Sequence, residues 1–253
     1  MTPPLPEGFL ARPIAHRALH GPARPENSAE ALRAAAEAGW GIEIDLQLSA
    51  DGEPMVFHDA TLDRMTAETG PLRARTAAEL SALPLTGGAE GMPTFARALE
   101  IVGGRVPLLV ELKDQSQGLD LTDGALERAA AAAALGYDGP LAFMSFNPHA
   151  VLWCAQVAPR IPRGLTTTDF RPEDWPGIAP ARLAHLREMA DLTAAGAAFV
   201  SHDRRDLANP KLAQIRAAGL PILTWTIRSH AEAQEALRIA DQITFEGYTP
   251  PSA

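Results

Sequence analysis

Acidic residues recur at a two-residue spacing in two apolar stretches of the chain. Glu43 and Asp45 lie in the run 41–48, and Glu111 precedes Lys113 by the same interval. Residues two apart in an extended strand point to the same side, so each stretch presents a pair of polar side chains on one face. Bringing carboxylates together is unfavourable unless a cation neutralises them. The spacing therefore predicts a cation site.

The types of the candidate ligands indicate which cation this is. Glu43, Asp45 and Glu111 offer only oxygen atoms, and such ligands suit one hard divalent ion, Mg²⁺ or Ca²⁺, with Mn²⁺ also compatible. No histidine is spaced within the trio, which argues against zinc. Solvated acids at strand ends are the structural alternative, but that explanation suits one residue better than three.

A turn signal brings a histidine toward these acids. Asp51-Gly52 is the strongest two-residue hairpin signal, and residues 55–58 read as the returning strand. If Asp51 and Gly52 are the two turn residues, residue 50 pairs with residue 53, and Asp45 faces His58. The Cβ atoms of directly opposed residues lie roughly 5 Å apart. We therefore expect His58 beside the carboxylates.

Histidine and cationic side chains could complete a catalytic site. His16 and His58 could act as general base and general acid, in either order, because imidazole titrates near neutrality. Lys113 would either pair with Glu111 structurally or help the metal to counter the charge of a phosphate. Arg17 suits a phosphate ligand, but it reaches the site only if the strand that contains His16 has already ended. Otherwise it is a surface arginine.

Three further residues have a structural and a functional interpretation. Asn27 could cap a helix over 27–39 through a capping box with Glu30, or Glu26 and Asn27 could buttress the site. Trp225 would be either inner core or a wall of the substrate pocket. The single cysteine, Cys154, rules out an internal disulfide. The remaining histidines are expected to be structural: His20, His149, His185, His202 and His230.

These residues must be positioned by a repeated unit of strand and helix. Strand-like runs begin near residues 14, 41, 108, 141, 161, 197, 221 and 242, mostly alternating with helical segments such as 121–135. This alternation predicts a parallel sheet, and eight units in 253 residues favour a closed (β/α)₈ TIM barrel. We expect one domain over 1–253 with a small insertion at about 59–106. The candidate residues then fall at the carboxyl ends of strands, where barrel active sites lie.

Composition excludes several classes of protein. The 22 basic and 31 acidic residues give a net charge of −9 without long basic runs, which argues against nucleic acid as a partner. No apolar run is long enough to span a bilayer, and residues 1–8 lack the features of a secretory signal. We therefore expect a cytoplasmic protein without stable membrane association, whose partner is a small molecule. Both a monomer and a homodimer remain open.

The order and spacing of the motifs resemble the glycerophosphodiester phosphodiesterase family, which belongs to the barrel phosphodiesterases similar to phosphatidylinositol phospholipase C. The resemblance implies metal-dependent cleavage of glycerophosphodiesters to glycerol 3-phosphate and an alcohol. It implies His16 and His58 as the acid/base pair, Glu43, Asp45 and Glu111 as metal ligands, and Arg17 and Lys113 on the phosphate. It rests on His16-Arg17, Pro25-Glu26-Asn27-Ser28, Glu43-Ile44-Asp45, Asp51-Gly52, Val56-Phe57-His58-Asp59, Thr61-Leu62-Asp63-Arg64, Pro93-Thr94, Glu111-Leu112-Lys113 and Leu223-Thr224-Trp225-Thr226.

The chain departs from the family pattern in three places, and other functions compete. Ala18 replaces a glycine, Ser28 replaces a threonine, and Thr244-Phe245-Glu246 replaces a Thr-Asp pair; we expect these changes to affect substrate choice more than chemistry. One alternative is a phospholipase-type diesterase or lyase acting on intact lipid. A second is a metal-dependent barrel isomerase or aldolase that uses Lys113. A third is a binding module without activity.

Overall fold

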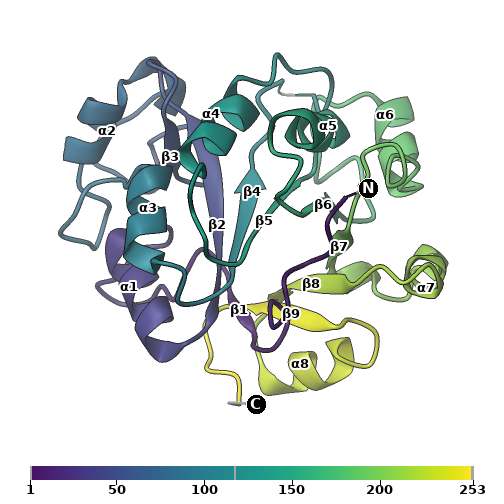
Figure 1. The fold of residues 1–253 in the computed structure, drawn as a ribbon. Coiled ribbons are helices and arrows are strands. Elements are labelled where there is room, and N and C mark those ends of the chain that lie inside the picture. Colours follow the sequence, from purple (N-terminus) through teal and green to yellow (C-terminus); the bar gives the residue numbers. More distant parts are fainter. Residues whose placement is uncertain (1, 117, 252–253) are drawn as a thin grey trace.

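Eight parallel strands close into a barrel in the computed structural model, which describes residues 2–116 and 118–251 (Figure 1). The first strand pairs with both the second and the last, which closes the sheet. The predicted (β/α)₈ TIM barrel is therefore confirmed. The barrel strands are β1 (Ile14–Ala15), β2 (Gly41–Leu48), β4 (Leu108–Leu112), β5 (Leu141–Ser145), β6 (Arg163–Thr167), β7 (Phe199–Asp203), β8 (Ile222–Ile227) and β9 (Gln242–Phe245).

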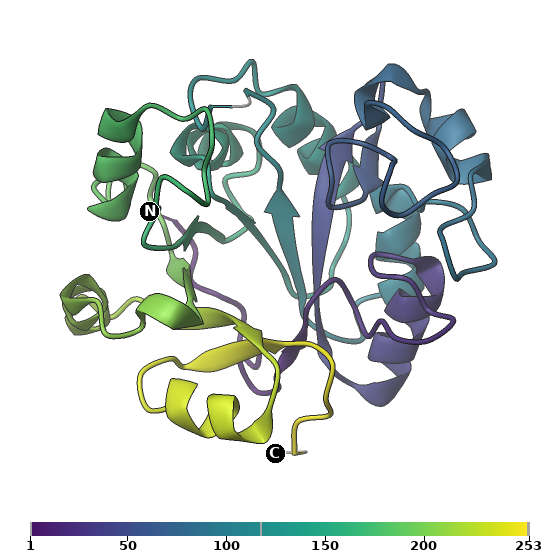
Figure 2. The same cartoon turned by 180° about the vertical axis from the view of Figure 1, so that it is seen from behind.

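Helices surround the barrel and connect its strands, as the two opposite views show (Figures 1 and 2). They are α1 (Ala29–Ala38), α3 (Phe95–Val102), α4 (Ala125–Ala133), α5 (Pro148–Val157), α6 (Pro180–Arg187), α7 (Pro210–Ala217) and α8 (His230–Ala236), with a 3₁₀ turn η2 (Arg204–Asp206). Within the described ranges, no helix has the length and apolar character needed to cross a bilayer.

The segment 49–94 between β2 and α3, called the insertion below, begins before the predicted start at about 59 and contains a short strand, a 3₁₀ turn and a short helix. These are β3 (Pro54–Val56), η1 (Leu72–Ala74) and α2 (Ala77–Ala82). β3 runs antiparallel to β2, and the insertion has its own small core around Met55, Leu72 and Leu80. α2 begins with a capping box between Thr76 and Glu79. The insertion is thus a packed extension of one barrel strand.

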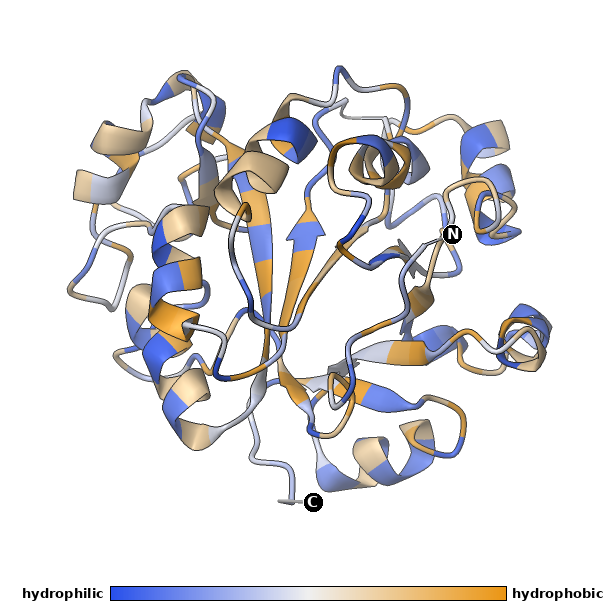
Figure 3. Cartoon of the chain, in the orientation of Figure 1, coloured by the Kyte–Doolittle hydropathy of each residue, from blue (hydrophilic) through white to orange (hydrophobic). Residues whose placement is uncertain are grey.

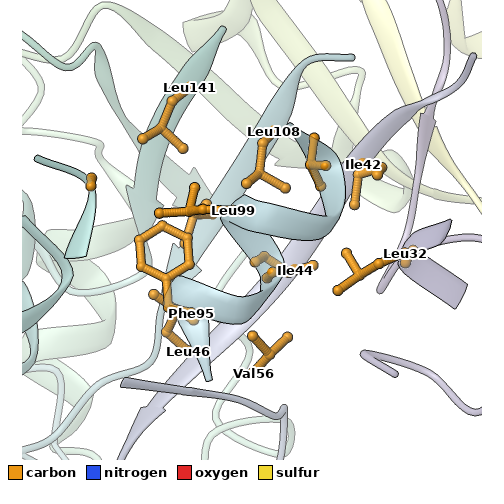
Figure 4. Packing of buried hydrophobic residues seen from close by; sticks show 14 of the residues in the cluster. Leu32, Ile42, Ile44, Leu46, Val56, Phe95, Leu99, Leu108 and Leu141 are labelled. Carbon is orange, nitrogen blue, oxygen red and sulfur yellow. The ribbon is translucent and has the colours of Figure 1, made fainter. Parts of the chain in front are cut away.

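Alternation along β2 and β4 separates the site from the core. Ile42, Ile44 and Leu46 face outward and pack with residues of α1 and α3, including Leu32 and Phe95 (Figure 4). Figure 3 shows polar and apolar residues alternating along β2 and one polar position near the end of the otherwise apolar β4. Because successive strand residues point to opposite faces, the intervening acids point into the barrel.

An apolar plug closes the barrel near the amino ends of its strands. Phe9, from the segment that precedes β1, is buried there against Ile14, Leu109, Phe199 and Leu223. Two residues further along β4, the inward position is occupied by Glu111 instead of Leu109. The barrel interior therefore changes from apolar to polar toward the carboxyl ends of the strands.

The predicted cap of α1 is wrong by one residue. Ser28 is the N-cap, and its Oγ accepts a hydrogen bond from the amide of Ala31 at 3.0 Å. Glu30 does not close a capping box, because its carboxylate accepts the amides of residues 89 and 90 in the insertion. Asn27 has a left-handed backbone (φ 58°), a conformation that asparagine adopts more readily than most residues. This conformation turns Asn27 away from the helix and toward β2.

The predicted hairpin register is also wrong by one residue. The observed pairs are Leu46 with Val56, Gln47 with Met55 and Leu48 with Pro54. The turn holds three residues instead of two, because the Ser49 amide bonds to the Glu53 carbonyl at 3.0 Å and the Ser49 hydroxyl accepts the Glu53 amide at 2.8 Å. Gly52 takes the left-handed conformation (φ 85°) that such turns require. Asp45 therefore faces Phe57, and His58 follows the end of β3.

A buried carboxylate on α4 sets a pH dependence of stability. Glu127 is 1 % exposed, and neither of its oxygens has a hydrogen-bond partner in residues 2–116 and 118–251. Burial, with a smaller contribution from Asp123, raises the pKa of Glu127 to about 7. The folded state therefore favours the protonated form, and stability falls as pH rises from the unfolded-state pKa of about 4.5 through 7.

The free energy of unfolding of Glu127→Gln, compared with that of the wild type, should be higher at pH 8 than at pH 4. We expect this difference between the two proteins to change by roughly 2–3 kcal/mol over that range. Urea unfolding of both proteins across this range measures it. Glu100 is an exposed glutamate on α3, and Glu100→Gln is the matched control that should show little pH dependence. A difference between wild type and Glu127→Gln that is constant with pH would contradict the assignment.

Candidate active site

A cavity of about 200 Å³ opens at the carboxyl ends of the barrel strands. Eight of the ten predicted site residues line it. The other two, Glu26 and Asn27, contact the lining residues Arg17 and Asp45. The lining comprises His16, Arg17, Glu43, Asp45, His58, Glu111, Lys113, Met144, Phe146, Thr166, Ser201, Trp225, Thr226, Arg228 and Thr244.

Three buried carboxylates meet in this cavity. Parallel pairing of β2 and β4 sets Asp45 opposite Glu111, and one oxygen from each of Glu43, Asp45 and Glu111 lies within 4.8 Å of the others. Burial raises the pKa of Glu43 well above its usual value, and the charges of Asp45 and Glu111 add to that effect. The cluster repels itself electrostatically, and its oxygen-only donors fit a hard divalent cation.

Lys113 lies between two of these carboxylates. Its Nζ is 2.7 Å from Asp45 Oδ1 and 2.7 Å from Glu111 Oε1. Burial alone would lower the pKa of Lys113, but the two carboxylates outweigh burial and raise it. The ammonium is therefore retained, and it offsets part of the charge of the three carboxylates.

Arg17 reaches the site because β1 ends at Ala15. Its backbone is left-handed (φ 52°), and its amide donates to Glu43 Oε2 at 2.8 Å. The guanidinium donates to Glu26 at 2.8 Å, while Nε lies 3.6 Å from Asp45 Oδ2. This buried Nε has no hydrogen-bond partner in the described part of the chain. Arg17 thus has a free donor at the carboxylate cluster.

The residue pair before α1 supports the site. Asn27 Nδ2 donates to Asp45 Oδ2 at 2.9 Å, and Asn27 Oδ1 accepts the Asp45 amide at 3.3 Å. The Asn27 amide donates to the Arg17 carbonyl at 2.9 Å. Asn27 therefore holds Asp45 in place, which favours the buttressing interpretation over the helix cap.

A chain of ion pairs connects His58 with Arg17. His58 Nδ1 is 2.7 Å from Asp59 Oδ1, and Arg64 bonds Asp59 at 2.7 Å and Glu26 at 2.6 Å. Glu26 in turn accepts from Arg17. The hydrogen bond from His58, together with Arg64, keeps the pKa of Asp59 well below its usual value. His58 is thereby oriented by an ionised carboxylate, and it lines the same cavity as Asp45 although the predicted register is wrong.

Glu246 orients the other histidine. Its Oε2 is 2.7 Å from His16 Nδ1 and 3.6 Å from His20 Nε2, and it also pairs with Arg228. Burial lowers the pKa of His16, an effect that the hydrogen bond with Glu246 partly offsets. A neutral ring that donates from Nδ1 keeps Nε2 as a proton acceptor. His20, expected to be structural, lies in the same cluster.

The sequence interpretation missed this role of Glu246, which it treated only as a departure from a family pattern. The available signal was its position, because Glu246 directly follows the last strand on the face of Thr244. The same criterion selects His16 at the end of the first strand. Arg64 carried no such signal, since it lies in the insertion and acts through Asp59 and Glu26.

Aromatic side chains form the opposite wall of the cavity. Trp225 Nε1 donates to the Ser201 carbonyl at 3.1 Å, and the indole meets Phe146 edge to face at 5.6 Å between centroids. Trp225 lines the cavity, which favours the pocket-wall interpretation. By contrast, Cys154 on α5 is buried outside the site, and burial raises its pKa, as suits a packing role.

The barrel is similar to solved structures of phosphodiesterases. The structure of an Oleispira antarctica phosphodiesterase in complex with the product sn-glycerol-3-phosphate is similar, with a TM-score of 0.74 and 28 % identity over 96 % of this chain and 93 % of that one. The chain belongs to the glycerophosphoryl diester phosphodiesterase family, whose model matches residues 16–242. The family resemblance stated from the sequence motifs is therefore confirmed.

Curated relatives agree with this family. A glycerophosphodiester phosphodiesterase of Caldanaerobacter subterraneus is 31 % identical over 159 residues, which are 60 % of this chain and 65 % of the relative. Glycerophosphodiester phosphodiesterase 1 of Bos taurus is 50 % identical over 60 residues, or 23 % of this chain. The chain thus spans slightly less than two thirds of the first relative and 18 % of the second.

Proposed function

We propose that this protein hydrolyses glycerophosphodiesters to glycerol 3-phosphate and an alcohol, using one divalent cation. The observation that supports this proposal is that one cavity is lined by the carboxylate cluster, three cationic side chains and two histidines that are each hydrogen-bonded to a carboxylate. The relative from Oleispira antarctica, described in complex with sn-glycerol-3-phosphate, supports the substrate class. Glu43, Asp45 and Glu111 would hold the cation.

The cationic side chains would bind the phosphodiester. When bound, Mg²⁺ or Ca²⁺ would neutralise phosphate oxygens and polarise the phosphorus–oxygen bonds. Lys113 is held in position by Asp45 and Glu111, and Arg17 Nε, 3.6 Å from Asp45 Oδ2, has no hydrogen-bond partner among the described residues. Fixed positive groups of this kind stabilise charge that develops during phosphoryl transfer.

The two histidines would divide proton transfer between them. His16, buried with a lowered pKa, is suited to accept a proton at Nε2 from the attacking hydroxyl. By family resemblance, this is the neighbouring glycerol hydroxyl, so a cyclic phosphate forms as the bond to the alcohol breaks. His58, held by Asp59, would donate a proton to the departing alcohol oxygen, and water then opens the cyclic phosphate with the roles reversed.

Glu246→Gln tests the proposed role of His16. Because the Glu246 carboxylate raises the pKa of His16, its removal lowers that pKa further, and the acid limb of the kcat profile shifts to lower pH. We also expect kcat to fall roughly tenfold, since the orientation of the imidazole is lost. A pH–rate profile of both proteins measures the two effects. An unchanged acid limb would contradict this role.

The site favours hydrolysis over aldolase chemistry. A Schiff-base lysine must lose its proton readily, whereas Lys113 donates to two carboxylates at 2.7 Å and its pKa is raised.

A coupled assay for glycerol 3-phosphate tests the proposed function directly. The purified protein is incubated with glycerophosphocholine, glycerophosphoethanolamine and glycerophosphoglycerol, before and after treatment with a chelator. We expect product release that the chelator abolishes and that Mg²⁺, Ca²⁺ or Mn²⁺ restores. Failure to release glycerol 3-phosphate from any of these diesters, with each ion present, would refute the proposal.

A further inference from the structure

Three hydroxyl groups that line the floor of the cavity have no hydrogen-bond partner in the described part of the chain. Thr166 of β6, Ser201 of β7 and Thr244 of β9 all line the cavity, and each residue is at most 2 % exposed. Their hydroxyl oxygens have no hydrogen-bond partner among residues 2–116 and 118–251. Each unpaired buried hydroxyl costs about 1–3 kcal/mol. Three in one cavity therefore indicate a ligand that pairs with them.

The surroundings restrict where that ligand can come from. Thr166 and Ser201 are direct neighbours on adjacent parallel strands. Gly164 and Phe199 lie two residues before Thr166 and Ser201 on the same inner faces of these strands. The Phe199 ring packs directly against Gly164, at only 2.4 Å from the position that a Cβ atom would occupy there. The ring thus closes the barrel beneath the hydroxyls as part of the apolar plug. Hydrogen bonds can therefore reach the hydroxyls of Thr166 and Ser201 only from the cavity above.

The position of this floor relative to the reacting groups indicates which part of the substrate it meets. Thr244 lies two residues before Glu246 on the same strand face, one level below the carboxylate that holds His16. Among the lining residues Arg228 is exposed and Phe146 and Trp225 are half-buried, so these three lie at the open side of the cavity. If the alcohol faces this opening, the glycerol arm faces the floor.

We propose that Thr166, Ser201 and Thr244 form a polyol subsite that binds the terminal glycerol hydroxyl, the one most distant from the phosphate. This inference rests on the proposed function and adds its substrate selectivity. A hydroxyl on the ligand can both donate to and accept from these side chains. An acyl ester at the same carbon would lose this pairing and would meet the closed floor of a cavity of only about 200 Å³. The subsite selects deacylated diesters over lysophospholipids.

A substrate analogue without that hydroxyl tests the subsite. The wild type should cleave 2-hydroxypropyl phosphocholine, which keeps the hydroxyl next to the phosphate ester, with a kcat/KM roughly tenfold below that for glycerophosphocholine. In Ser201→Ala the ratio of the two kcat/KM values should approach one, because the variant lacks the hydroxyl that pairs with the substrate hydroxyl. Lysophosphatidylcholine should not be cleaved.

A matched control uses another buried serine. Ser145 at the end of β5 donates to the Leu112 carbonyl at 2.7 Å, so Ser145→Ala makes the same chemical change away from the floor and should keep the wild-type ratio. Thr166→Val serves as the second variant if Ser201→Ala does not fold, with melting temperatures as the check. Equal kcat/KM values in the wild type, or a ratio that neither floor variant changes, would overturn the inference.

Direct binding separates this inference from the proposed function. Calorimetry compares glycerol 3-phosphate with 2-hydroxypropyl phosphate on the wild type, and we expect roughly tenfold tighter binding of glycerol 3-phosphate. If the protein cleaves no diester but keeps this preference, only the proposed function fails. If it cleaves diesters but binds both phosphates equally, only the subsite fails, and the floor is filled by water alone.

Discussion

His16→Ala is expected to lower the turnover of glycerophosphocholine by roughly 10²- to 10⁴-fold, the usual contribution of a positioned general acid or base. The structure gives the physical reason: His16 is buried, its pKa is lowered, and Glu246 holds its Nδ1 at 2.7 Å. A proton acceptor fixed in this way cannot be replaced by water at the same distance. Steady-state kinetics with the coupled assay measures the effect.

Two companion variants make this prediction specific. His58→Ala should give a loss of similar size, because the proposed mechanism uses both histidines in each half of the reaction. His149 lies on α5 and is not among the residues that line the cavity, so His149→Ala should retain wild-type turnover. A His16→Ala or His58→Ala protein with wild-type turnover would remove that histidine from the mechanism.

Asp45→Asn should weaken divalent-cation binding by at least about 100-fold and abolish measurable hydrolysis. Loss of a residue that only orients a ligand typically weakens metal binding 10- to 100-fold, and Asp45 is a proposed ligand itself. It is also the carboxylate on which Asn27, Arg17 and Lys113 converge. Calorimetric titration with Mg²⁺ and Ca²⁺ measures the change without relying on activity.

A graded comparison tests whether Asp45 acts as a ligand. Asn27→Ala removes only the group that holds Asp45, so it should weaken cation binding by roughly 10- to 100-fold and retain part of the activity. Asp120 is an exposed aspartate outside the site, and Asp120→Asn should bind the cation like the wild type. Undiminished cation binding by Asp45→Asn would show that the ion is held elsewhere.

The sequence predicted the barrel because its strands are strongly patterned. In β2, Ile42 and Ile44 alternate with Glu43 and Asp45, and each of the eight predicted strand runs corresponds to a barrel strand. The pattern reports which face is buried, and this fixes the fold class. The same pattern predicts helix boundaries less accurately than strands. The helix expected over 121–135 begins only at Ala125, because Gly124 has a left-handed backbone (φ 71°).

Local turn chemistry limited the finer predictions. The pair Asp51-Gly52 predicts a two-residue turn, but the Ser49 hydroxyl bonds to both the Glu53 amide and the Asp51 carboxylate, and this adds a residue to the turn. Asp51 also accepts the Ala77 amide at the start of α2. The register thus depends on a tertiary contact that no local signal contains. His58 still reaches the cavity, because β3 ends before it.

The site residues were predictable where they follow strands and not where they act through long contacts. His16, Glu111 and Lys113 lie at the ends of strands, Glu43 and Asp45 lie within the longer β2, and all five line the cavity. Glu246 also lies at the end of a strand and was overlooked. Arg64 joins the site through side chains 5 and 38 residues away in sequence, a separation at which one sequence carries no pairing signal.

The hydrogen bond between the Asn27 amide and the Arg17 carbonyl ties together the two ends of the segment 18–26. The tip of this segment, Pro22 to Arg24, is exposed. Residues added or removed at the tip would leave both clamped ends in place, with His16 just before one and the residue that holds Asp45 at the other. Variation in loop length at this tip is thus separated from the chemistry of the site.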